Sequence, residues 1–306
     1  MMEKVILRLA NSNRVENLVN QSPVTEEFLG NYVAGEDRAA VSEMVRELVW
    51  QGLSTSVTVL ASDSRSVSQT TTVRNEYLDL LAHLKSDGLG DNCELSLKPS
   101  TLGSLLSTDT LVENVAAICS AASGAGLGVT LDMEHAGTVD TTLKLADRLR
   151  GDFPWIGVTI QSNLYRSESD CRDLAEIGAR VRLCKGLYRE GASAAFRDPH
   201  QVDLNFVRLM RILFEGRAYP MIATHDPRLI NISQQLAESN GFLPSDWEIQ
   251  MMMGVRPWEQ RRIADIGQRC RVHVPYGTGW YPYYLRAIAE RPDNVKVFVR
   301  SLVGRR

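Results

Sequence analysis

One unit repeats along this chain of 306 residues: a short β-branched or aliphatic run, a polar residue, a loop and a helical pattern. Strands that alternate with helices form parallel sheets, and about eight such units close a (β/α)8 barrel. The expected strands lie at 56–60, 94–97, 128–131, 156–160, 181–183, 220–223, 248–252 and 271–274.

Helical patterns fill the gaps between these runs. They are expected at 38–51, 138–150, 169–177, 202–214, 228–239 and 257–268. A doubly wound open sheet has the same alternation and is the main alternative fold. Since no linker-like tract divides the chain, we expect one barrel domain over 31–306, preceded by an N-terminal helical segment over 1–30.

Composition narrows the class of protein. Hydrophobic residues make up 44% of the chain, enough to bury a core of barrel size, and the net charge of -3 provides no field that would attract nucleic acid. No apolar run is long enough to span a bilayer, and the opening residues do not resemble a signal peptide. The five cysteines are odd in number and never spaced CxxC, so we expect reduced thiols and a cytoplasmic location.

Two stretches between the expected elements stand out. Residues 62–72 (SDSRSVSQTTT) are unusually polar, and we expect a loop there that is a mobile lid or an ordinary surface loop. The glycine-rich stretch 123–128 is similar to a dinucleotide-binding fingerprint, but it follows a helix and precedes a strand, the reverse of the order that phosphate binding requires. It is therefore expected to be a helix-to-strand loop.

Polar side chains stand at the C-terminal ends of seven expected strands. In a (β/α)8 barrel these ends form the active-site face, and so many buried polar groups would be costly unless they meet a ligand or one another. The residues are Lys98, Asp132 to Glu134, Gln161, Arg182 with Lys185, Thr224 to Asp226, Gln250, and His273 with Tyr276.

The segment 180–190 (RVRLCKGLYRE) is the strongest of these signals. It delivers Arg182 at the end of a strand, followed at once by Lys185 and Gly186, which favours an anionic or electron-rich ligand. If the alternate residues of each strand face the barrel interior, Lys98, Asp132 and Arg182 meet near its axis. The alternative is a buried ion network that only holds the barrel together.

Other chemistries are less well supported. A metallohydrolase barrel usually has a His-x-His pair on an early strand, and this chain has none, so we expect no metal site. A Schiff-base lyase or aldolase remains open, because Lys98 and Lys185 both follow expected strands and such an enzyme needs one desolvated amine.

At these same residues the chain resembles the proline dehydrogenases, flavin-dependent barrels that oxidise the pyrrolidine ring of proline. The resemblance runs collinearly from about residue 32 to the C-terminus. Its motifs are YVAGE at 32–36, SLKPSTLG at 96–103, LDME at 131–134, QSNLYR at 161–166, RLCKGLY at 182–188, ATHD at 223–226 and VPYGTGWYPYYLR at 274–286.

The resemblance implies a role for each matching position. Asp132 and Arg182 would be the catalytic pair, with Arg182 beside the flavin, and Lys98 would help to hold the substrate carboxylate. The FAD site would comprise Met133, Gln161, Arg182, Lys185, Gly186, Leu187, Thr224, His225 and Gln250. The family's last helix, which lies near the barrel mouth, would add Tyr283, Arg286 and Ala287, and strand eight would add His273.

The reaction that the resemblance implies is hydride transfer from a cyclic secondary amine to FAD, which yields a cyclic imine. Electrons would then pass to a quinone or another acceptor, with at most a peripheral contact with the inner face of the membrane, because no basic amphipathic helix is evident.

Two departures from the family pattern fall in the expected substrate pocket. The family's adjacent arginines read Arg286-Ala287 here, and the strand-eight tyrosine is His273. The substrate is therefore expected to be L-proline or a related cyclic amine, with a modified or carboxylate-masked proline as an alternative. A barrel that binds FAD without turnover is a further alternative.

Overall fold

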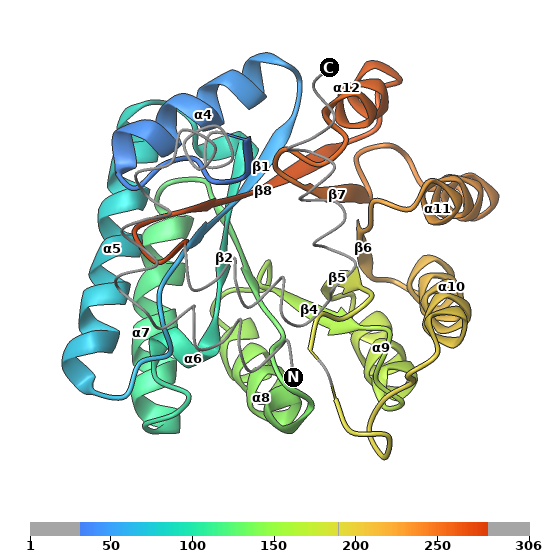
Figure 1. Ribbon diagram of the computed structural model, residues 1–306, viewed down its shortest axis with the longest axis horizontal. Coiled ribbons are helices and arrows are strands. Elements are labelled where there is room, and N and C mark those ends of the chain that lie inside the picture. The colour runs from blue at the N-terminus through green and yellow to red at the C-terminus, as the bar shows by residue number, and fades with distance from the viewer. Residues whose placement is uncertain (1–30, 189, 281–306) are drawn as a thin grey trace, which may run out of the picture.

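The computed structural model describes residues 31–188 and 190–280. Eight parallel strands close into a barrel in sequence order, as Figure 1 shows. The strands are β1 (Ser54–Val59), β2 (Cys93–Leu97), β3 (Gly128–Leu131), β4 (Gly157–Gln161), β5 (Arg180–Cys184), β6 (Tyr219–Ala223), β7 (Glu248–Met252) and β8 (Cys270–Tyr276).

The pairing of β1 with β8 decides the fold class. These two strands run parallel in register from Ser54 opposite Arg271 to Val59 opposite Tyr276. An open sheet would leave both as edges, so the predicted (β/α)8 barrel is confirmed and the doubly wound sheet is wrong.

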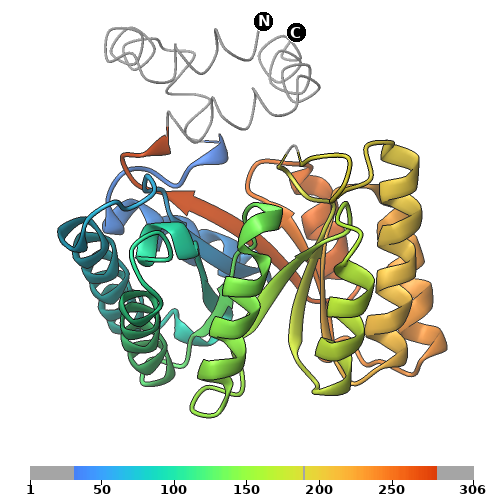
Figure 2. The ribbon, with the colours of Figure 1, turned by 90° about the horizontal axis from the view of Figure 1, so that it is seen from below.

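Helices surround the barrel and run along the outside of the strands (Figures 1 and 2). The α-helices are α4 (Arg38–Trp50), α5 (Val67–Ser86), α6 (Pro99–Leu102), α7 (Thr108–Ser123), α8 (Val139–Arg150), α9 (Ser167–Glu176), α10 (Pro199–Glu215), α11 (Pro227–Ser239) and α12 (Pro257–Asp265). Short 3-10 turns, η1 (Gly90–Asn92) and η2 (Ala136–Thr138), precede β2 and α8. Both α10 and α11 begin with proline after an aspartate whose carboxylate accepts a backbone N–H, which sets where the helix starts.

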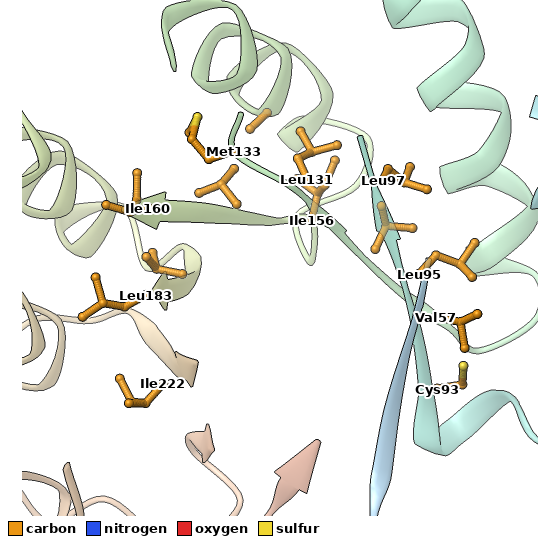
Figure 3. Packing of buried hydrophobic residues seen from close by; sticks show 14 of the residues in the cluster. Val57, Cys93, Leu95, Leu97, Leu131, Met133, Ile156, Ile160, Leu183 and Ile222 are labelled. Carbon is orange, nitrogen blue, oxygen red and sulfur yellow. The ribbon is translucent and has the colours of Figure 1, made fainter. Parts of the chain in front are cut away.

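The hydrophobic core lies between the strands and the helices. Side chains such as Val57, Leu95, Leu131 and Leu183 point away from the barrel centre, towards the helices (Figure 3), and all are fully buried. Burying these faces supplies the main driving force for closing the helices onto the barrel.

The barrel interior is polar instead. Branched aliphatic residues fill many (β/α)8 barrels. Here the alternate strand positions carry buried Ser56, Glu94, Thr130, Arg182 and Glu248. Charged side chains buried in the barrel interior must be paired. Their contacts therefore determine which charges face the C-terminal ends of the strands.

One loop prediction was wrong. Residues 67–72 belong to α5, which starts at Val67 because the Ser66 hydroxyl accepts the Gln69 N–H and caps the helix. Thr70 and Val73 are buried and anchor the first turns. Only 62–66 are loop. The glycine-rich stretch does join α7 to β3, as predicted.

The structure also bears on the cysteines, on membrane spans and on metal-binding groups. All five cysteines are free, and four of them are buried. Within 31–188 and 190–280, no helix is both long and apolar enough to cross a membrane, and no three potential metal-binding side chains gather at one point. The predicted N-terminal helical segment over 1–30 and the predicted final helix near the barrel mouth lie outside the described residues.

Candidate active site

A cavity of about 450 Å³ opens at the C-terminal ends of the strands. Most of the predicted site residues line it, although they come from strands or following loops spread across the whole chain. The predicted residues on its wall are Lys98, Asp132, Met133, Gln161, Arg182, Leu187, His225, Gln250 and His273.

The centre of the cavity is an ion pair. Arg182 Nη1 donates to Asp132 Oδ1 at 2.7 Å, and the Ser96 hydroxyl, which accepts from the same Nη1, donates to that oxygen at 2.7 Å. Arg182 is almost fully buried, whereas the Asp132 side chain is about one fifth exposed. The pair therefore presents a fixed cation and a partly accessible carboxylate to anything bound in the cavity.

Gln161 lies on one wall. Its Nε2 donates to the Glu134 carbonyl at 2.6 Å, while its Oε1 is buried without a partner among the described residues. The Glu134 carboxylate accepts both the N–H and the hydroxyl of Ser100, and burial raises its pKa.

Two histidines on the wall are neutral at neutral pH. Burial, with the charge of Arg256, lowers the pKa of His225 to about 4, and its Nε2 accepts the Met252 N–H at 2.8 Å. The proton of His225 is therefore on Nδ1. Burial, with the charge of Arg182, lowers the pKa of His273 to about 4 as well.

Three predicted cofactor residues are not on the cavity wall. Lys185 Nζ forms an ion pair with Asp203 at 2.6 Å, and the Thr224 hydroxyl accepts the Asp226 N–H. Gly186 has φ +96°, and a Cβ there would collide with the Asn163 amide, so only glycine fits the turn. Tyr283, Arg286 and Ala287 lie outside the described residues.

The Lys185 ion pair bears on the Schiff-base alternative. A lysine that attacks a carbonyl needs an amine that is readily deprotonated. Lys185 Nζ pairs with Asp203 at 2.6 Å and does not line the cavity, so it is not placed to attack a carbonyl bound there.

Sequence reasoning missed part of the wall. Asp63 and Ser100 were not predicted as site residues, because Asp63 lies on the loop after β1 and Ser100 on the short helix α6, and the strand pattern does not fix the path of either segment. The further residues are Ala61, Ser62, Asp63, Ser100, Ser104, Leu105, His135, Thr138, Thr159, Cys184, Tyr188, Ala223, Met251, Met252 and Gly279. Glu134, one of the polar residues predicted at the strand ends, also lines the wall.

The wall suits a flat ring with a polar edge. Apolar side chains of Met133, Leu187, Met251 and Met252 line it. Gln161 Oε1 and Thr159 Oγ1, which have no hydrogen-bond partner among the described residues, are acceptors close to the same wall. Pockets for such ligands combine mostly apolar walls with a few fixed polar groups. The residues present therefore fit the isoalloxazine ring of a flavin.

Solved structures share this fold. Proline utilization A from Bdellovibrio bacteriovorus, inactivated by N-propargylglycine, superposes with a TM-score of 0.79 at 21% identity, over 84% of this chain and 32% of that one. A proline utilization A mutant from Bradyrhizobium japonicum gives a TM-score of 0.73 at 19% identity, over 87% of this chain and 31% of the other. The chain thus spans about a third of these longer proteins, and at such identity the likeness concerns the fold.

Sequence relatives are closer. The chain is 33% identical to proline dehydrogenase 1 of Bacillus subtilis (strain 168) over 272 residues, which is 89% of each chain. It is 30% identical to the proline dehydrogenase of Deinococcus radiodurans over 303 residues, 98% of this chain and 97% of the relative. The proline dehydrogenase family model matches residues 41–297, which include all eight strands. With this match, and with relatives aligned over nearly their full length, the chain belongs to the proline dehydrogenase family.

Proposed function

We propose that this protein is an FAD-dependent dehydrogenase that oxidises L-proline, or a related cyclic secondary amine, to the cyclic imine. For proline the product is pyrroline-5-carboxylate. Family membership supports the reaction class. The observation that carries the proposal is the Asp132–Arg182 ion pair, which shares one cavity with Lys98 and His273.

FAD would supply the acceptor for the hydride that leaves the ring carbon next to nitrogen. Met133, Gln161, Leu187, His225 and Gln250 would hold it from the cavity wall. The loop at Lys185 and Gly186 and the buried Thr224 would support that site from behind. The shape of the Gly186 turn and the unpartnered Gln161 Oε1 support this assignment.

The chain's own residues would bind and orient the amine. Lys98 would attract the substrate carboxylate, and Asp132 and His273 would flank the ring. Hydride loss requires the neutral amine, and a positive charge nearby disfavours the ammonium form. Lys98 and Arg182 supply two such charges, which the Asp132 carboxylate partly offsets, while the neutral His273 adds none.

The substrate could also be a modified or carboxylate-masked proline. Ala287 and His273 both depart from the family pattern, and a lost arginine would weaken carboxylate recognition. We further propose that electrons pass to a quinone or another acceptor, and that the protein is cytoplasmic with at most peripheral membrane contact.

The test is anaerobic reduction of the purified protein loaded with FAD. Absorbance near ~450 nm should bleach on addition of proline, hydroxyproline, pipecolate or a proline ester, and the ranking of rates identifies the substrate. Arg182→Lys should bind FAD and bleach at least about tenfold more slowly, because the lysine cannot reproduce the fixed fork of contacts. Protein that stays colourless in excess FAD, or that keeps its colour with every amine, would contradict the proposal.

A further inference from the structure

Every N–H of the Arg182 guanidinium has an acceptor within the protein. An arginine carries five such donors. Here Nε donates to Gln250 Oε1 at 2.6 Å, Nη1 to Ser96 Oγ at 2.5 Å and Asp132 Oδ1 at 2.7 Å, and Nη2 to Ser56 Oγ at 3.0 Å and Glu94 Oε1 at 2.6 Å. The guanidinium is thus held in one place by residues of three other strands and by Asp132, which directly follows β3.

Glu94 is the deepest of these partners. It lies fully buried on β2, four residues before Lys98. Its second oxygen, Oε2, accepts from the Thr130 hydroxyl at 3.3 Å and from Arg180 at 3.4 Å, and Arg271 Nε lies at 3.9 Å. Burial alone would raise the pKa of Glu94, but Arg271 and Arg182 outweigh it and lower the pKa, so the carboxylate is charged.

Two carboxylates therefore contact the Arg182 guanidinium, which faces the cavity. Asp132 contacts it from the cavity side and Glu94 from below, at 2.7 and 2.6 Å. Glu248, the other buried carboxylate of the interior, contacts Arg271 at 2.7 Å instead. At such distances between buried groups, the charges of Glu94 and Asp132 strongly weaken the electrostatic field that Arg182 produces in the cavity.

We propose that Glu94 is a positioning residue for the reaction: it holds the Arg182 guanidinium in place and offsets its charge, and so limits how strongly the cavity stabilises an electron-rich ligand. The inference rests on the proposed function, in which that ligand is the reduced flavin. Reduction adds negative charge to the ring system, and a nearby cation favours it. A carboxylate beneath the cation opposes that effect.

The test is the Glu94→Gln variant, which keeps the size of the side chain and removes its charge. The midpoint potential of the bound flavin, measured by spectroelectrochemical titration, should be more positive than in the parent protein. An unchanged or more negative potential would overturn the inference. Because the potential is read on protein that has bound FAD, loss of folded protein alone does not move it.

Glu248→Gln is the matched control. It also removes one buried carboxylate from the interior, but Glu248 contacts Gln250 and Arg271 and makes no contact with Arg182 within the described residues. It should raise the potential less than Glu94→Gln does. Equal shifts in the two variants would show a general effect of interior charge and would overturn the specific role of Glu94.

A second variant covers the case in which Glu94→Gln does not fold. The double variant Glu94→Gln/Arg180→Gln removes the negative charge of Glu94 together with the positive charge of Arg180, its partly exposed partner at the N-terminal end of β5. Its potential should still exceed that of the parent, because Arg182 has lost one of its two carboxylate partners while Arg180 does not line the active-site cavity. A parent protein that binds no FAD would defeat the proposed function; a parent reduced by proline with unshifted variants would defeat only this inference.

Discussion

At the scale of single residues, the two cavity histidines link stability to pH. The pKa values of His225 and His273 are both lowered from 6.5 to about 4, chiefly by burial. Between these values the unfolded chain binds protons that the folded protein does not, so the free energy of unfolding decreases as pH falls from 6.5 to 4. Glu248, whose pKa is lowered to about 2 by Arg271 against the effect of burial, loses its contribution only below its unfolded value of 4.5.

Replacing both histidines should therefore flatten the upper part of this profile. For His225→Gln/His273→Gln we expect a smaller loss of unfolding free energy between pH 6.5 and 4.5 than in the parent, measured by urea denaturation. The exposed His200→Gln is the control and should keep the parent slope. A double variant with the parent slope would show that the histidines are not the source.

At the scale of elements, α5 fastens two strands together through one hydroxyl. Tyr77, fully buried on α5, donates to the Ser96 carbonyl of β2 at 2.9 Å and accepts the Val59 N–H of β1 at 3.2 Å. Ser96 itself contacts Arg182 through its hydroxyl, and Val59 lies three residues beyond Ser56, another partner of Arg182, on the same strand. The helix therefore braces the strand ends beneath the candidate active site.

Removing that hydroxyl should lower the stability of the fold even though the ring stays in place. Tyr77→Phe leaves a buried N–H and a buried carbonyl without their partner, which we expect to lower the free energy of unfolding by about 1–3 kcal/mol. Chemical denaturation measures the loss. Tyr165→Phe, at a half-exposed ring, is the control and should change stability by less than about 0.5 kcal/mol; equal losses would contradict the bracing role.

At the scale of the whole molecule, a charged interior takes part in closing the barrel. Arg271 on β8 contacts Glu248 on β7 at 2.7 Å and donates to the Thr55 carbonyl on β1 at 2.8 Å, so it spans the seam where the first and last strands meet. The pKa of Arg271 is raised: burial would lower it, but Glu248 and Glu94 outweigh that effect.

Arg271→Met should destabilise the barrel by roughly 3–5 kcal/mol, because it leaves Glu248 buried without its cation. In the double variant Arg271→Met/Glu248→Gln the unpaired charge is gone, and part of the loss should be recovered. Thermal and urea unfolding of the three proteins check this. A double variant less stable than Arg271→Met would mean that packing, rather than charge, dominates at the seam.

The order of strands and helices could be read from the sequence, because hydrophobic periodicity and helix-terminal residues are local signals. All eight strands lie within two residues of their predicted positions at each end. Parity along the strands also placed Asp132 and Arg182 on the inner face. The same period of two, followed back from Lys98, also places Ser96 and Glu94 on the inner face. Neither was predicted as a site residue, because both lie below the strand ends.

Only the tertiary structure decided which of these groups touch. The five acceptors around Arg182 come from residues 56 to 250, and barrel closure brings them together through register that no local pattern specifies. The same holds for Lys185, which pairs with Asp203 instead of lining the cavity. It also holds for Asp63 and Ser100, which reach the cavity wall from a loop and from the short helix α6. The sequence alone determined what kinds of side chain reach the barrel mouth, because periodicity is a local property of the chain. Which side chains contact one another was decided by the tertiary structure, because those contacts depend on packing between residues far apart in the sequence.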